Sequence, residues 1–148
     1  MPVDVRTEIE IDRPCGEVAA YASNPDNVAA WYENILAVEW KTAPPLCVGS
    51  QIAFVARFLG RHLAYTYEVN ALDPGERLVM STNRPFRMET TYTWEDTEGG
   101  GTRMTLRNRG EPSGFSRVAA PLMASAMRRA NRKDLRQLKH ILETTDPH

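Results

Sequence analysis

An alternating stretch lies near the N-terminus of the sequence: Val3-Asp4-Val5-Arg6-Thr7-Glu8-Ile9-Glu10-Ile11. Apolar residues or Thr alternate there with charged residues, which is the period-2 pattern of a β-strand with one face in a core and the other in water. Towards the C-terminus the apolar residues instead recur at helical spacing, opposite a face rich in Arg and Lys: Leu122, Met123, Met127, Leu135, Leu138, Ile141 and Leu142. The two patterns predict a strand near one end and a long amphipathic helix near the other.

Between these segments the sequence predicts two short helices and then a run of strands. Pro14 suits the first turn of a helix, and the turn at residues 24–27 can start a second helix that runs to Trp31. Further strands are expected at residues 36–42, 51–58, 62–72, 77–83, 87–96 and 102–109, with Pro- or Gly-containing turns between them. Short connections favour antiparallel neighbours. The expected fold class is α+β: a curved antiparallel sheet of about seven strands, two short helices after the first strand, and one long C-terminal helix over the sheet.

Composition indicates a single domain over residues 1–148, with 42% hydrophobic and 25% charged residues. The formal net charge of −1 gives no reason to expect a nucleic-acid partner. Cys15 and Cys47 lack the spacing of a metal site and are interpreted as reduced thiols. No signal-peptide pattern and no apolar run long enough to span a bilayer occur. We therefore expect a cytoplasmic protein, monomeric or homodimeric, without integral membrane association.

The residues after the first strand resemble a known family. The segment from residue 11 to residue 31 consists of a strand that ends in Pro, a first helix with Val18 and Tyr21, a Pro–Asn turn, and then Trp31. It is similar to the entry motif of the START-like (SRPBCC) superfamily. Residues 134–143 resemble that family's closing helix, and the likeness is nearest to the polyketide cyclase/dehydrase-type branch. The resemblance implies a helix-grip fold with a hydrophobic cavity between sheet and helix. Family members bind lipids, sterols, polyketides or other apolar molecules, and only some of them are enzymes.

The parity of the predicted meander places three loops at one end of the sheet, where the long helix also starts. Apolar residues occupy the tips of these loops: Leu59, Phe86 and Phe115. Such residues suit a lid over an apolar pocket. They could equally plug the end of the core.

The inward face of each strand should supply the wall of the cavity. Strand 51–58 is ambiguous, because Ile52, Phe54 and Ala56 compete with Ala53 and Val55 for the inward face. With the helix and the mouth included, the predicted ligand-binding residues are Trp40, Phe54, Tyr65, Tyr67, Met80, Phe86, Tyr92, Asn108, Met123 and Met127. The alternative is a core filled by the same side chains.

Catalytic patterns are weak. No phosphate loop, nucleophile elbow or metal-ligand spacing is present, so neither a metal nor a cofactor is expected. Tyr65, Tyr67 and Tyr92 are candidate acid–base groups, whereas cross-strand pairing accounts for charged residues such as Glu89. We expect a carrier or sensor of a small hydrophobic or aromatic ligand. The alternatives are a cyclase or dehydratase-type enzyme that uses pocket Tyr groups and, more weakly, a protein-interaction module.

Overall fold

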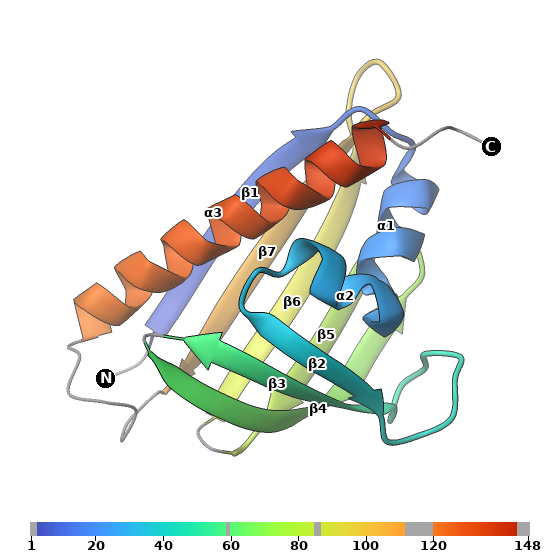
Figure 1. Cartoon of the computed structure of the whole chain (residues 1–148). Coiled ribbons are helices and arrows are strands. Elements are labelled where there is room, and N and C mark those ends of the chain that lie inside the picture. The colour runs from blue at the N-terminus through green and yellow to red at the C-terminus, as the bar shows by residue number, and fades with distance from the viewer. Residues whose placement is uncertain (1–2, 59, 85–86, 112–119, 145–148) are drawn as a thin grey trace.

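The computed structural model describes residues 3–58, 60–84, 87–111 and 120–144 (Figure 1). Its elements, in chain order, are β1 (Val3–Ile11), α1 (Cys15–Ser23), α2 (Pro25–Trp31), β2 (Ile35–Trp40), β3 (Gln51–Phe58), β4 (Arg61–Asp73), β5 (Arg77–Thr82), β6 (Arg87–Asp96), β7 (Thr102–Glu111) and α3 (Ala120–Thr144). The strand bounds differ from the predicted ones by one or two residues, which is the usual uncertainty at strand ends.

The seven strands form one antiparallel sheet in the order β1-β7-β6-β5-β4-β3-β2. Strands β2 to β7 are therefore a simple meander, and β1 closes the other side by pairing with β7, where Val5 lies opposite Asn108. All three helices lie on one face of the curved sheet, with α3 running along β1 and β7 (Figure 1). The predicted helix-grip arrangement of the α+β class is confirmed.

The turn between α1 and α2 forms for a local reason. Asn24 precedes α2, and its side-chain oxygen accepts a hydrogen bond of 3.0 Å from the backbone N–H of Asp26. Pro25 occupies the first turn of α2, where its missing N–H leaves no hydrogen bond unmade. This turn directs α2 towards β2 and places Trp31 in the core, with 1% of its surface exposed.

The C-terminal half of α3 closes the core. Leu135 and Leu138 are 1% and 0% exposed, as the helical spacing predicts, and they pack in one cluster with Val18 and Trp31. A second, smaller cluster joins Met123 to β1 near the N-terminal end of α3. The two clusters hold the helix at both ends over the sheet and leave the region between them to the cavity described below.

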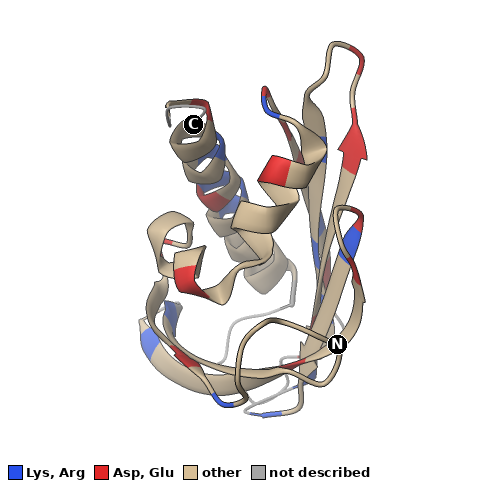
Figure 2. Ribbon diagram, turned by 90° about the vertical axis from the view of Figure 1, so that its right-hand side faces the viewer, with Lys and Arg blue, Asp and Glu red and all other residues tan. Residues whose placement is uncertain are grey.

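The outer face of the sheet is charged and solvated. Arg109 pairs with Glu89 at 2.6 Å and Arg107 with Asp4 at 2.7 Å, each across neighbouring strands. Acidic and basic residues are interspersed along the strands in Figure 2. Such exposed pairs are screened by water and contribute little to stability. The predicted cross-strand role of Glu89 is confirmed, so this residue faces away from the space between sheet and helix.

Within the residues described, none of the helices combines the length and the apolar composition required to cross a lipid bilayer.

Candidate functional site

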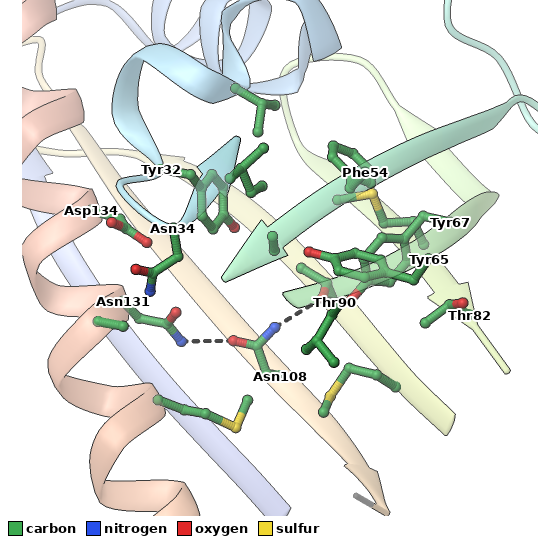
Figure 3. A pocket seen from close by; sticks show the side chains of 18 of the residues that line it. Tyr32, Asn34, Phe54, Tyr65, Tyr67, Thr82, Thr90, Asn108, Asn131 and Asp134 are labelled. Carbon is green, nitrogen blue, oxygen red and sulfur yellow. Dashed lines mark hydrogen bonds between the residues drawn. The ribbon is translucent and has the colours of Figure 1, made fainter. Parts of the chain in front are cut away.

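A cavity of about 160 Å³ lies between the inner face of the sheet and the N-terminal half of α3. Strands β3 to β7 supply its floor, α3 supplies one wall, and the segment that follows α2 supplies another (Figure 3). Most of the residues predicted from the sequence line it: Phe54, Tyr65, Tyr67, Met80, Tyr92, Asn108, Met123 and Met127. The strand alternation brings them together, because every second side chain of a strand faces the same side.

One of the predicted ligand-binding residues that the structure describes is not part of this wall. Trp40 lies outside the cavity, and its indole N–H donates to Asp26 Oδ1 at 2.8 Å. The reason is that β2 is an edge strand whose inner side is covered by α2. Phe86 lies outside the described residues, as do Leu59 and Phe115 of the predicted lid.

The aromatic part of the wall is a packed group of rings. Phe54 stacks on Tyr65 with ring centres 5.7 Å apart, and Tyr67 meets Tyr65 edge-on at 5.4 Å. This assignment resolves the ambiguity of β3, since Ile52, Phe54 and Ala56 are buried. The group offers a flat apolar surface of the kind that holds aromatic ligands.

A chain of hydrogen bonds crosses the floor of the cavity from α3 to β4. Asn131 Nδ2 donates to Asn108 Oδ1 at 2.6 Å, and Asn108 Nδ2 donates to Thr90 Oγ1 at 2.8 Å. The hydroxyls of Thr90 and Tyr67 are 2.9 Å apart. Because these groups are buried, each bond fixes the orientation of its neighbour. The chain ties α3 to the sheet at the cavity (Figure 3).

A second polar group is a pair of tyrosines. The hydroxyls of Tyr32 and Tyr92 are 2.7 Å apart. One O–H hydrogen is used between them, so the other can be donated to a ligand oxygen. Tyr32 was not predicted, because it belongs to the connection after α2, whose side-chain directions do not follow from periodicity.

The ionisation of the tyrosines limits their chemistry. Burial raises the pKa of Tyr67 to about 12, and burial likewise raises the pKa values of Tyr32, Tyr65 and Tyr92. All four hydroxyls therefore keep their protons near neutral pH. They can donate hydrogen bonds to a ligand in this form, and the acid–base role of Tyr65, Tyr67 and Tyr92 stays a prediction.

Asp134 is the unexpected member of the site. It is 3% exposed and lines the cavity from α3. Burial raises the pKa of its carboxyl group to about 7, although a hydrogen bond from the backbone N–H of Glu33 to Oδ1, at 3.1 Å, acts in the opposite direction. Asn131 and Asp134 interrupt the apolar stripe between Met127 and Leu138. Polar residues on the buried stripe of a helix were the signal in the sequence that could have identified both.

In the described part of the chain, no group of three or more His, Cys, Asp or Glu side chains is placed so as to hold a metal ion.

Known proteins share this architecture. A family model described as polyketide cyclase/dehydrase and lipid transport matches residues 2–143. No curated protein matches the chain. Among solved structures, a START superfamily protein from Mycobacterium smegmatis has a TM-score of 0.82 at 11% identity, over 95% of this chain and 97% of its own.

Two further solved structures are similar. The protein TTHA0849 from Thermus thermophilus has a TM-score of 0.77 at 20% identity, over 96% of this chain and 99% of its own. The di-domain ARO/CYC BexL from the BE-7585A biosynthetic pathway has a TM-score of 0.74 at 19% identity, over 95% of this chain and 46% of its own. At such identities the likeness is one of fold alone.

Proposed function

The chain belongs to the polyketide cyclase/dehydrase and lipid transport family, and from that premise we propose that it binds a small aromatic or other apolar ligand between its sheet and α3. The resemblance to START-like proteins read from the sequence is confirmed. The observation that carries the proposal is a cavity with mostly apolar walls and a few uncommitted polar atoms.

The volume of the cavity limits the size of the ligand that fits without a change of the walls. An engineered apolar cavity of about 150 Å³ accepts benzene, whereas sites for drug-sized molecules span roughly 300–1,000 Å³. At about 160 Å³ the space suits a single ring. A sterol or a polycyclic polyketide would need the walls to move. Met80, Met88, Met123 and Met127 line the cavity, and unbranched thioether side chains adapt readily to such movement.

The polar groups favour a ligand that carries an oxygen atom. Tyr65 makes no hydrogen bond through its hydroxyl in the described structure, and the Tyr32–Tyr92 pair retains one O–H. Both are protonated donors near neutral pH. A ligand carbonyl or ether oxygen would accept from them at little cost, because neither donor has to break a bond within the protein.

One observation favours a second candidate function, an enzyme of the cyclase or dehydratase type. Asp134 combines burial in the cavity with a pKa of about 7, which suits a group that takes up and returns a proton near neutral pH. Tyr32 or Tyr92 would donate a hydrogen bond to the substrate carbonyl while Asp134 removed a proton from the neighbouring carbon. The solved structure described as ARO/CYC supports this candidate at the level of fold only.

Mass spectrometry of the small molecules that the purified protein retains tests the proposal. A carrier should release an aromatic or apolar compound unchanged after incubation. An enzyme should release it altered, and Asp134→Asn should abolish the alteration. A protein that retains no such compound, and that fails to bind an added single-ring aromatic probe, would contradict both candidates.

A further inference from the structure

Asp134 presents an unused acceptor to the cavity. Its Oδ1 accepts the backbone N–H of Glu33, and its Oδ2 makes no hydrogen bond to the described part of the protein. Only 3% of the residue's surface is exposed. Figure 3 shows the side chain projecting from α3 towards Asn34 and Tyr32. In the described residues, the fully enclosed side-chain atoms without a partner are the indole nitrogens of Trp31 and Trp94, so Asp134 Oδ2 keeps some accessible surface. A ligand that covers this oxygen must replace its hydration, because an acceptor that loses water without gaining a partner is costly.

The neighbouring amides extend this polar end of the cavity. Asn131 uses its Nδ2 atom for Asn108, which leaves its Oδ1 as an acceptor. The side-chain amide of Asn34 lines the cavity and makes no hydrogen bond to the described part of the protein. The end of the cavity near Asp134 therefore offers both amide donors and three side-chain acceptor oxygens, those of Asp134 Oδ2, Asn131 and Asn34, and Asp134 is the one of these three residues whose side chain can carry a charge.

A ligand group that contacts Asp134 Oδ2 should donate a hydrogen bond to it. A ligand anion would be repelled by the carboxylate, and a purely apolar ligand would leave Oδ2 without a partner. A hydroxyl group attached to an aromatic ring meets both requirements. The ring can pack against the apolar wall, and the O–H can donate a hydrogen bond to Asp134 Oδ2. Hydrogen bonds to an ionised acceptor are also stronger than those between neutral groups.

We propose that Asp134 is the binding site for a hydroxyl group of the ligand, so that the protein selects phenols over apolar aromatic compounds of the same size. The proposal rests on the function proposed above and adds the chemical class of the ligand. Asp134 acts here as a binding residue that orients the ring by its hydroxyl.

Phenol and toluene are the probes that test this selection, because they have nearly the same shape and differ in one O–H. Their affinities are to be measured by NMR titration of the wild type, Asp134→Asn and Asp134→Leu. In Asp134→Asn the side-chain oxygen can keep the bond to Glu33, so the amide N–H₂ would face the cavity and present donors where the ligand needs an acceptor. Thr82→Val is the matched control, because Thr82 lines the cavity but already donates to the backbone oxygen of Arg84 at 3.1 Å.

The expected result is that the ratio of phenol to toluene affinity falls about tenfold or more in both Asp134 variants, in line with the loss of a charge-assisted hydrogen bond. The ratio should remain unchanged in Thr82→Val. If toluene binds and the ratio is the same in every variant, the proposed role of Asp134 is wrong while the proposed function stands. If neither phenol nor toluene binds the folded wild type, the proposed role of Asp134 and the proposed function are both wrong.

A pH series gives a readout that a purely structural role of Asp134 would not produce. The charged and titratable groups around Asp134 are Glu33 and Tyr32 after α2, Tyr92 on β6, and Lys133 on α3. Because the carboxylate is the better acceptor, the wild-type preference for phenol should rise as pH rises through about 7. A flat preference in the wild type, equal to that of Asp134→Asn, would overturn the proposal.

Discussion

Filling part of the cavity should stabilise the protein and weaken ligand binding. Ala130 lines the cavity from α3 and sits in the middle of a helix, where Leu is also well accommodated. At about 24 cal/mol per Å³, an empty apolar space of 160 Å³ corresponds to roughly 4 kcal/mol of lost stability. Ala130→Leu would occupy part of it.

The magnitude follows from the added atoms. Leu brings three more carbon atoms than Ala, each contributing about 0.8 kcal/mol when buried. Fixing the Leu rotamer costs about 0.5–1 kcal/mol. We therefore expect the free energy of unfolding to increase by about 1–2 kcal/mol, which should raise the melting temperature by about 3–8 °C.

Two assays check this expectation. Urea unfolding measures the stability, and titration with toluene measures the binding, which should weaken at least about tenfold. Ala20→Leu on the exposed side of α1 is the control and should change stability by less than about 0.5 kcal/mol. A loss of more than about 1 kcal/mol in Ala130→Leu, with toluene affinity retained, would refute the existence of the space.

Three other changes test the core, the polar chain and the ionisation of Asp134. Leu138→Ala should lower the free energy of unfolding by about 2–5 kcal/mol, while Leu122→Ala, at a residue that is 65% exposed, should change it by less than about 0.5 kcal/mol; equal effects in urea melts would contradict the assigned face of α3. Asn131→Leu should cost about 1–3 kcal/mol, because the buried Oδ1 of Asn108 loses its donor, and a neutral result in the same assay would show that the chain is not structural. The pKa of Asp134 is raised from 3.8 to about 7, so the native state binds more protons than the unfolded state between these values, and this group destabilises the protein increasingly as pH rises. The stability of Asp134→Asn relative to the wild type should therefore be greater at about pH 8 than at about pH 5, and a pH-independent difference would rule out the raised pKa.

The alternation of the strands was sufficient to predict the sheet and most of the cavity floor. In β5, Leu78, Met80 and Thr82 are all buried, as their period-2 spacing predicts. Strand β3 could not be oriented from the sequence, because both of its faces carry apolar residues. The structure leaves Val55 39% exposed on the outer face, so only the packing of the sheet against the helices decides the orientation.

The polar part of the site was largely beyond prediction. Tyr32 and Asn34 come from the connection between α2 and β2, where no periodicity relates side-chain direction to position. Asp134 was assigned only to the closing helix, since its burial depends on how α3 lies against the segment after α2. Trp40 was predicted to face the cavity, but the helix that covers its edge strand separates it from that space.

The methionine methyl groups offer the most direct test of the central claim that the space between sheet and α3 binds aromatic ligands. Among the residues that the structure describes, four methionines line the cavity: Met80, Met88, Met123 and Met127. Met104 is fully buried but does not line it, so it is an internal control. In a titration of protein labelled with ¹³C at the methionine methyl groups, phenol should shift the signals of the four cavity methionines and leave that of Met104 in place. If the four signals do not move at saturating phenol, or if Met104 alone responds, the cavity is not the binding site.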